Sequence, residues 1–417
     1  MPSSGSAREI VVIGGGIVGL ATARALTEVL PDAPVTVLEA EDRWGAHQSG
    51  HNSNVVHSGL YYPPGSLKAR LARHGGELVI EYCEKQGLPV ERRGKLVVAT
   101  AESQLAPMAE LARRGRANGV TLREISGAEV RELEPDVAAI AALDIRDTAI
   151  TDFAAVTTAY ADDLALAGVA LRLGARVTAV DPHPRGAVVH TTEGEYDAAV
   201  VVNCAGLFSD RVARMCGTDP GVRVQPFRGE YSALAQHAGT TVHRPIYPVP
   251  DPELPFLGVH VTPGVDGTVH VGPNAVPAFS RTGYRWRDVD ASTISAWWRD
   301  PGMRRLARSY WRDGAREVMR SLTKPLLVAD VRRMLPGVHG SDLRRAGAGV
   351  RAQAVDDQGR LVDDFVIKTS PRAVHVLNAP SPAATSSLLI GRYVAGLARE
   401  AYDGTPAPDV AAVVERG

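Results

Sequence analysis

The stretch Glu9–Leu26, EIVVIGGGIVGLATARAL, constrains the fold of this chain more than any other. It combines an apolar strand, a glycine-rich turn and the first turns of a helix, and Gly14, Gly16 and Gly19 have the spacing GxGxxG. In such a turn the first glycine permits the tight bend, the second lets a pyrophosphate approach the backbone, and the third lets helix and strand pack closely. The stretch therefore predicts a dinucleotide-binding βαβ unit.

The segments that follow favour this prediction over a plain glycine turn. A helix is expected over residues 17–30 and a second strand over 34–40. Glu39 ends that strand, where a carboxylate can accept both ribose hydroxyls and would repel a 2′-phosphate. The expected residues of this cradle are Gly14, Gly16, Ile17, Val18, Gly19, Glu39 and Ala40.

The remaining sequence favours FAD over NAD. The segment SGHNSNVVHSGLYY is expected to run back along the cofactor, RVTAV to offer a backbone edge to the adenine, and NCAG to let the cofactor approach closely. Near the C-terminus, NAPSPAATSSLLIG predicts a helix N-terminus that would stabilise the anion of a reduced flavin, which nicotinamide enzymes do not need. These segments supply the cofactor-binding candidates His51, Asn52, Ser53, Val177, Ala205, Gly206, Ser386, Ser387 and Leu388.

A chain of 417 residues is expected to hold more than one core. Further strands are expected over 176–182, 187–196 and 198–206, helices over 66–86, 102–118 and 304–320, and a strand, loop and helix at the C-terminus. Residues 222–274 show alternating β-branched runs, typical of an antiparallel sheet with one exposed face. We therefore predict an α/β fold: a discontinuous Rossmann-like FAD-binding domain with an inserted α+β substrate domain built on an antiparallel sheet. The expected boundaries are 1–90, 145–215 and 335–417 for the first, and 91–144 and 216–334 for the second.

Composition argues against several other classes of protein. The formal net charge of -1 gives no field that would attract nucleic acid or an anionic membrane. The apolar runs are too short to span a membrane. The three cysteines lie far apart and lack the spacing of zinc ligands or of a disulfide framework. We expect a cytoplasmic protein without a metal, and peripheral association with a membrane stays open.

Several segments are specific enough to carry a family resemblance: SGHNSNVVHSGLYYPPGSLKARL, PFRGEY, IYPVPDPELPFLGVH, GPNAV and NAPSPAATSSL. Through them nearly the whole chain resembles the D-amino-acid oxidase superfamily of FAD-dependent oxidoreductases, and within it the L-2-hydroxyglutarate oxidases and dehydrogenases. VVHSGLYY also resembles the IHGGLRYL stretch of FAD-dependent glycerol-3-phosphate dehydrogenases, which implies that His57 lies beside the flavin. Three positions depart from the family pattern and bear on the choice of substrate: Asn54 replaces a usual glycine, Ser232 a second aromatic residue, and Pro263 a basic residue.

The resemblance implies oxidation of L-2-hydroxyglutarate, or a closely related 2-hydroxy acid, to the 2-oxo acid. A hydride would pass to flavin N5, and oxygen or a quinone would take the electrons. The hydroxyl proton needs a base with a pKa near neutrality, for which His57 and His260 are the candidates. Arg351 is the candidate that grips a substrate carboxylate through two parallel hydrogen bonds. Further candidate contacts to this small dicarboxylate are Tyr62, Lys68, Arg228 and Tyr231.

Two other functions stay open on the sequence. An amine oxidase of the sarcosine or D-amino-acid type would use one carboxylate clamp with a neutral amine in place of the hydroxyl, although the histidine in VVHSGLYY favours the alcohol. A flavin-binding protein without redox turnover would keep the cofactor motifs alone. The carboxylates Asp356, Asp357, Asp363 and Asp364 flank QGRLV, an expected hairpin turn, and are interpreted as solvated turn residues rather than as a metal site.

Overall fold

The structure, a computed structural model, describes residues 8–235, 239–250, 258–309, 319, 321 and 323–415. The GxGxxG unit forms as predicted: β1 (Glu9–Ile13) leads through the turn into α1 (Ile17–Val29), and β2 (Val35–Leu38) follows. β1 and β2 pair in parallel. A parallel pair needs a crossover connection, which α1 supplies, and this places the glycine turn at the carboxyl end of β1.

Among the described residues, one sheet of eight strands is built around this unit. β12 (Glu195–Asn203) pairs in parallel with β1 on one side and with β20 (Ala373–Asn378) on the other. The central, buried position of β12 agrees with its continuous apolar run. The remaining strands of this sheet are β9 (Ala170–Arg172), β10 (Val177–His183), β11 (Gly186–Thr191) and β19 (Val366–Ser370). Segments from both ends of the chain therefore build one sheet, as the discontinuous arrangement predicts.

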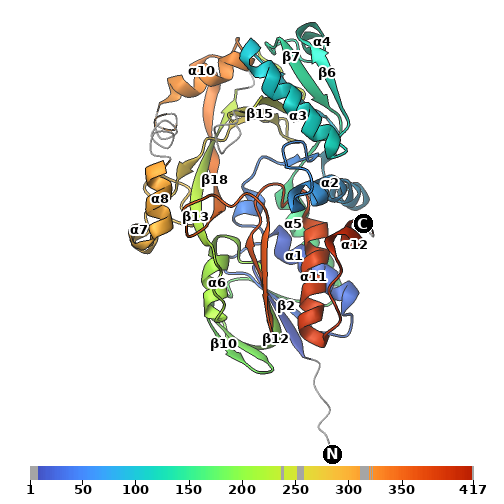
Figure 1. Ribbon diagram of the computed structural model, residues 1–417, viewed down its shortest axis with the longest axis vertical. Coiled ribbons are helices and arrows are strands. Elements are labelled where there is room, and N and C mark those ends of the chain that lie inside the picture. Colours follow the sequence, from blue (N-terminus) through green and yellow to red (C-terminus); the bar gives the residue numbers. More distant parts are fainter. Residues whose placement is uncertain are drawn as a thin grey trace, which may run out of the picture.

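Helices pack on this sheet and close the largest apolar core. Figure 1 shows α11 (Ser387–Asp403) running alongside α1, and α5 (Phe153–Leu166) and α2 (Leu67–Gln86) complete the layer. The buried cluster joins β1, α1 and α11 through Ile10, Val12, Leu20, Leu26, Leu389 and Val394. Each such side chain contributes about 1.5–3 kcal/mol when it leaves water, so this core holds the glycine turn in place.

A second sheet has nine strands among the described residues. Its longest pair is β13 (Arg223–Leu234) with β18 (Leu343–Val355), which run antiparallel through the middle of the view in Figure 1. The other strands are β5 (Lys95–Ala99), β6 (Leu122–Ser126), β7 (Ala141–Ile145), β14 (Ile246–Pro248), β15 (His260–Pro263), β16 (Val269–Gly272) and β17 (Val276–Pro277). Most pairings are antiparallel as predicted, but β5 and β14 pair in parallel.

The expectation of one solvent-exposed face is wrong for β15, since all four of its residues are buried. The reason is that β15 lies between β14 and β16, with Val261 in an apolar cluster on one face and His260 directed to the cavity described below. The predicted domain boundaries stay a prediction. β18 falls in a segment assigned to the FAD-binding domain, yet it pairs with β13 in the second sheet.

A small third sheet joins β3 (Val55–Val56), β8 (Ala149–Thr151) and β4 (Val90–Glu91). The remaining helices are α3 (Leu105–Ala117), α4 (Gly127–Leu133), α6 (Ser209–Met215), α7 (Ala291–Arg299), α8 (Pro301–Ser309), α10 (Lys324–Met334) and α12 (Val410–Glu415). The helix expected over 304–320 begins at Pro301 as α8, and residues 310–318 and 320 lie outside the described residues.

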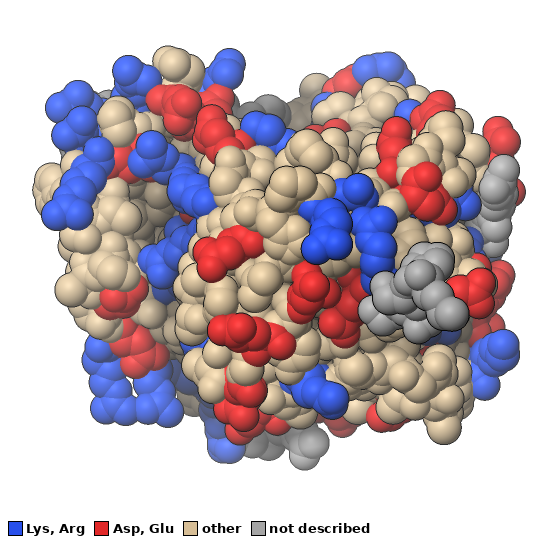
Figure 2. Space-filling view, turned by 90° about the horizontal axis from the view of Figure 1, so that it is seen from below, with Lys and Arg blue, Asp and Glu red and all other residues tan. Residues whose placement is uncertain are grey.

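No helix in the described part of the chain combines the length and apolar character of a membrane span. Basic and acidic side chains are interspersed over the face shown in Figure 2, as a net charge of -1 leads one to expect.

Candidate active site

A cavity of about 1260 Å³ is lined by residues of both large sheets. Ligand pockets commonly measure about 300–1,000 Å³, so this cavity has room for a dinucleotide together with a small substrate. One part of its wall is the glycine turn with the carboxyl ends of β1 and β2. Another part is formed by side chains from β13, β14, β15 and β18.

The glycine turn leaves no room for side chains where the helix meets the strand. Gly14 has a φ of +113°, and a Cβ there would lie 2.4 Å from the Cys204 carbonyl oxygen. A Cβ on Gly19 would lie 2.0 Å from the Gly14 carbonyl oxygen. Gly19 therefore serves helix packing and does not line the cavity, whereas Gly14, Gly16, Ile17 and Val18 do. Gly16 is the N-cap of α1 and has no side chain to cover the helix N-terminus, whose Ile17 amide donates to Ser49 Oγ; the partial positive charge of the helix end favours an anion there.

Glu39 lies at the end of β2, where the sequence places a ribose-binding carboxylate. Its Oε2 accepts a hydrogen bond from the Gly15 amide at 2.7 Å, and its Oε1 accepts one from the Glu41 amide at 2.9 Å. These bonds fix the carboxylate beside the glycine turn. Ala40 and Val177 also line the cavity on this side, and Ala205 and Gly206 line it after β12.

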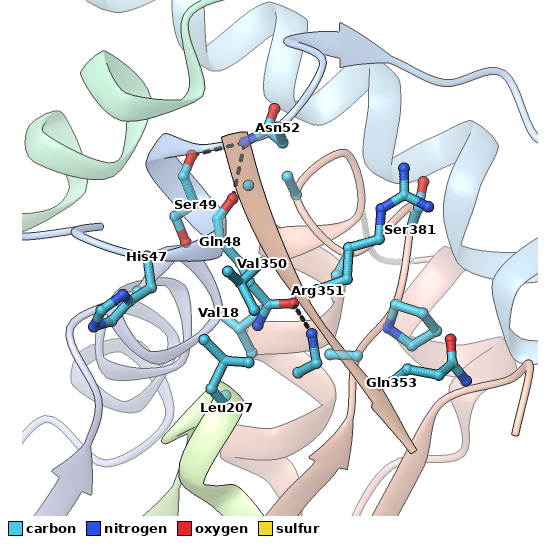
Figure 3. A pocket seen from close by; sticks show the side chains of 18 of the residues that line it. Val18, His47, Gln48, Ser49, Asn52, Leu207, Val350, Arg351, Gln353 and Ser381 are labelled. Atoms are coloured by element: carbon cyan, nitrogen blue, oxygen red, sulfur yellow. Dashed lines mark hydrogen bonds between the residues drawn. The ribbon is translucent and has the colours of Figure 1, made fainter. Parts of the chain in front are cut away.

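The segment after β2 lies along the cavity and includes His51, Asn52 and Ser53. Figure 3 shows Asn52 donating to the carbonyl oxygens of Gln48 and Ser49, at 3.2 and 2.7 Å. Sequence reasoning missed two residues here. Ser49 Oγ accepts from the Ile17 amide at 2.9 Å, and Gln48 Oε1 accepts from the Ala352 amide of β18 at 2.8 Å. Loop residues show no periodic pattern that would identify them as functional. The only indication in the sequence was that Gln48 and Ser49 adjoin the histidine- and asparagine-rich segment.

His57 and His260 both line the cavity. His57 Nδ1 is buried and has no hydrogen-bond partner among the described residues. Burial lowers the pKa of His57 to about 3, aided by the charges of Lys95, His260 and Arg351. The imidazole is therefore neutral at physiological pH, and its pKa lies well below the near-neutral value expected of the base.

His260 has a defined tautomer. Its Nδ1 lies 3.2 Å from the Gly258 carbonyl oxygen, which only accepts, so Nδ1 carries the proton and Nε2 the lone pair. Nε2 is buried without a partner in the described part of the chain. Burial, opposed in part by the Gly258 hydrogen bond, lowers the pKa of His260 to about 3, and the charges of Arg351 and Lys95 act in the same direction as burial. The Tyr247 ring stacks on the imidazole, with centroids 4.0 Å apart and planes 11° apart.

Arg351 projects from β18 into the cavity with its side chain exposed there (Figure 3). Tyr231 of β13 lines the same wall, and burial raises the pKa of its hydroxyl against the opposing charge of Arg351. Lys68 and Tyr62 also line the cavity, with Lys68 Nζ 5.5 Å from the centroid of the Tyr62 ring. Lys68 Nζ donates to Asp363 at 2.8 Å, so part of its charge is already compensated.

Five predicted site residues do not line the cavity, and Gly19, which serves the packing of α1 on the glycine turn, is one of them. Arg228 does not line the cavity: it is 1% exposed, its guanidinium lies 4.3 Å from the centroid of the Trp286 ring, and it pairs with Glu230 at 3.3 Å. The other three are Ser386, Ser387 and Leu388, at the start of α11. The preceding loop, residues 379–385, lines the cavity instead, so the prediction located this segment about one helical turn late.

The three departures from the family pattern do not line the cavity either. Asn54 has a φ of 56°, a left-handed conformation that glycine adopts freely and that asparagine tolerates better than most residues. Its Oδ1 accepts from the Phe153 amide at 3.1 Å. The substitution at this position is therefore a matter of backbone conformation and not of substrate contact.

The aspartates beside QGRLV do not form a metal site. Among the described residues no group of histidines, cysteines and acidic residues could hold a metal ion. Asp356 accepts hydrogen bonds within its own turn. Asp364 accepts from the amides of Leu67 and Lys68, each at 3.1 Å, and so caps α2. The turn interpretation fits Asp356, while Asp363 and Asp364 hold the N-terminus of α2 against the cavity wall.

Sequence reasoning also missed Lys95, Tyr61 and Tyr247. Lys95 is 1% exposed at the start of β5, and its Nζ lies 4.6 Å from the Tyr61 ring centroid and 5.0 Å from that of Tyr247. The sequence did contain an indication of Lys95: a lysine begins the apolar run in GKLVVA, and the chain has only five lysines.

Comparison with known proteins identifies the family of this chain. L-2-hydroxyglutarate dehydrogenase from Escherichia coli (strain K12) is 41% identical over 387 residues, 93% of this chain and 92% of that protein. The mitochondrial L-2-hydroxyglutarate dehydrogenase of Homo sapiens is 39% identical over 419 residues, 96% of this chain and 90% of that protein. Dithionite-reduced L-α-glycerophosphate oxidase from Mycoplasma pneumoniae, with FAD bound, shares the fold with a TM-score of 0.77 at 21% identity, over 97% of both chains. The family model for FAD dependent oxidoreductases, DAO, matches residues 9–397, and the chain belongs to that family.

Proposed function

We propose that this protein oxidises L-2-hydroxyglutarate to the corresponding 2-oxo acid in an FAD-dependent reaction. One observation carries the proposal: a single cavity joins the dinucleotide cradle at Gly14 to Arg351 and to the neutral imidazoles of His57 and His260. The relatives from Escherichia coli and Homo sapiens, both named L-2-hydroxyglutarate dehydrogenases, support this choice of substrate.

The residues of the cradle fit FAD. Gly14 and Gly16 leave the backbone open to a pyrophosphate at the α1 N-terminus, and Glu39 is fixed where ribose hydroxyls would need an acceptor. Val177 lies on the side assigned to the adenine. When bound, FAD supplies the two-electron acceptor for the reaction.

Arg351 would bind and orient the substrate. Its guanidinium is exposed inside the cavity, so its donors can form the two parallel hydrogen bonds that a carboxylate accepts. A substrate with two carboxylates needs a second polar wall, for which Lys68 and Tyr62 are the candidates. Asp363 compensates only part of the charge on Lys68, because its own side chain is 83% exposed to solvent.

The neutral histidines would take the hydroxyl proton. Nε2 of His260 is the better placed base, because the Gly258 carbonyl fixes the proton on Nδ1 and leaves the lone pair free. His57 is the second candidate, since its Nδ1 is also without a partner among the described residues. Loss of the hydroxyl proton to a neutral imidazole raises electron density on the substrate oxygen and so favours departure of the hydride from Cα.

The electron acceptor and the cell compartment belong to the proposal as well. We propose oxygen or a quinone as the acceptor, and the cytoplasm as the compartment, with peripheral contact to a membrane if the acceptor is a quinone. Reoxidation of the substrate-reduced enzyme by dissolved oxygen, compared with a soluble quinone, distinguishes the two acceptors. Failure of both oxygen and the quinone to reoxidise the reduced flavin would contradict both.

The decisive experiment mixes the purified yellow holoenzyme with resolved 2-hydroxy acids in the absence of oxygen. We expect loss of the oxidised-flavin absorbance with L-2-hydroxyglutarate and not with the D enantiomer. A panel of sarcosine, glycine and D-amino acids serves as the control for amine oxidation. Bleaching by an amine and not by the hydroxy acid would replace the proposal with the amine oxidase, and no bleaching by any compound would favour a binding protein.

A further inference from the structure

Lys95 is a buried cation that the reaction as described does not use. Its side chain is 1% exposed, and no described residue offers it a hydrogen bond or a carboxylate partner. The faces of Tyr61 and Tyr247 take the place of a counter-ion, at 4.6 and 5.0 Å from Nζ to the ring centroids. The ammonium is thus held by two aromatic rings, both of which line the cavity.

Such a charge is costly to bury and therefore calls for a reason. The rest of β5 is apolar and buried, and a leucine or methionine would satisfy the same position without the loss of hydration. Basic residues in this chain are mostly arginine, yet two of its five lysines, Lys68 and Lys95, are buried beside the cavity. Lys68 has its partner in Asp363, whereas Lys95 lies over the rings of Tyr61 and Tyr247.

The two rings connect Lys95 to the histidines. Tyr247 has Lys95 near one side of its ring and stacks on the His260 imidazole, with centroids 4.0 Å apart. Tyr61 lies four residues after His57, on the same cavity-lining segment. After burial, the charge of Lys95 is the largest cause that lowers the pKa of His57, and it acts on His260 after Arg351.

The other titratable groups near His57 and His260 do not supply the same positive charge as Lys95. The charge of Arg351 on β18 also lowers the pKa of both histidines, and Tyr62 and Tyr231 are uncharged because burial raises the pKa of each. Asp144 of β7 is opposite Leu96 and so lies on the other face of the sheet, where Arg244 pairs with it at 3.1 Å. Burial lowers the pKa of Lys95 to about 7. Its positive charge is therefore present over the acidic range in which an ordinary histidine gains its proton.

We propose that Lys95 is a positioning residue that acts from behind Tyr61 and Tyr247 to keep His57, and to a smaller extent His260, unprotonated. The inference rests on the proposed function, in which a neutral imidazole accepts the substrate hydroxyl proton. Lys95 touches neither substrate nor cofactor in this scheme. Its positive charge disfavours the imidazolium form by repulsion, so that the imidazole stays unprotonated at acidic pH.

The experiment compares the wild-type holoenzyme with Lys95→Met, which removes the charge, and Lys95→Arg, which keeps it. The first readout is the pH profile of kcat/KM with L-2-hydroxyglutarate. The second is an NMR titration of holoenzyme labelled with ¹³C at histidine Cε1, with the signals assigned through His57→Gln and His260→Gln. Flavin absorbance and a thermal melt establish that each variant is folded. If Lys95→Met lacks bound flavin, Lys95→Gln takes its place.

For Lys95→Met we expect the acid limb of kcat/KM to move up by about one pH unit, a loss of about tenfold on that limb, if His57 is the base, and by less if His260 is the base. The His57 signal should titrate at correspondingly higher pH, with a smaller change for His260, and Lys95→Arg should restore the wild-type profile. A uniform loss of activity with unchanged histidine titrations would show a merely structural lysine and overturn the proposal. The NMR titration needs no turnover, so an enzyme inactive toward L-2-hydroxyglutarate refutes the proposed function and still decides the role of Lys95.

Discussion

The glycine turn and the histidine cluster line the same cavity but are built in different ways. The turn binds through its backbone, and its residues follow one another within β1 and α1. The cluster is built from side chains that separate strands and loops supply: His57, Tyr247, His260 and Arg351 line the cavity, and Lys95 lies behind Tyr247. The glycine turn therefore requires residues without a Cβ, whereas the function of the cluster depends on the charge and tautomer of its side chains.

The largest expected effect comes from adding a methyl group to the turn. In Gly19→Ala the new Cβ would lie 2.0 Å from the Gly14 carbonyl oxygen, so helix and strand must separate. We expect a loss of about 4 kcal/mol or more in the free energy of unfolding, together with loss of bound flavin. Gly337→Ala is the control, because its Cβ would meet Thr240 at an ordinary 3.5 Å. Equal stability of the two variants would contradict a backbone-built cradle.

The next effect separates the two histidines within the cluster. We expect His260→Gln to lower kcat by about 10²–10⁴-fold with flavin absorbance unchanged, because the variant lacks a basic nitrogen at Nε2. His57→Gln should cost less if His260 is the base. His183→Gln, which replaces a histidine outside the cavity lining, is the matched control. The reverse order of the two losses would assign the base to His57.

The substrate arginine is expected to matter for binding more than for cofactor retention. Arg351→Met removes two charge-assisted hydrogen bonds to a carboxylate, so kcat/KM should fall by about a hundredfold, mainly through KM. Arg344→Gln, on the exposed part of the same strand, should leave the kinetics unchanged. A normal KM in Arg351→Met would remove Arg351 from the substrate site.

The low pKa values of the histidines also have a consequence for stability. The pKa of His57 falls from 6.5 to about 3 on folding, so between these values the unfolded chain binds the extra proton. The free energy of unfolding should therefore decrease as the pH falls from 6.5 toward 3. His57→Gln should decrease less over the same range, as measured by chemical denaturation at several pH values. Parallel curves for the two proteins would show that His57 is charged in the folded state.

The smallest effect is expected at a residue that departs from the family pattern. Asn54→Gly restores a residue suited to the positive φ but loses the hydrogen bond from the Phe153 amide. Because Asn54 does not line the cavity, KM for L-2-hydroxyglutarate should change by less than about threefold, while the melting temperature shifts by a few degrees at most. A larger change in KM would mean that the conformation of this loop controls substrate access.

The same comparison explains which parts of the site were predictable. Gly14, Glu39 and the strands around them follow from local spacing, since a βαβ unit fixes its own geometry. His57, His260 and Arg351 were identified through family resemblance, and the structure places all three around one cavity. Their electrostatic setting was not predictable, because the burial of Lys95 and its approach to Tyr61 and Tyr247 depend on how β5 pairs with β14.

Some residues predicted to belong to the site do not line the cavity, because the sequence pattern does not show on which side of an element a side chain lies. PFRGEY predicted a substrate contact at Arg228, but alternation along β13 carries that side chain to Trp286 and Glu230, away from the cavity. The helix N-terminus does lie at Ser386, but the preceding loop, residues 379–385, lines the cavity in place of Ser386, Ser387 and Leu388.

The hydrogen bond from the Ala352 amide to Gln48 Oε1 links these two kinds of architecture. Gln48 precedes Ser49, whose hydroxyl accepts from the first turn of α1, and Ala352 follows Arg351. A displacement of the loop that contacts the N-terminus of α1 would therefore pass through this hydrogen bond to the strand that carries Arg351. We expect an ordered sequence in which the nucleotide enters before the dicarboxylate.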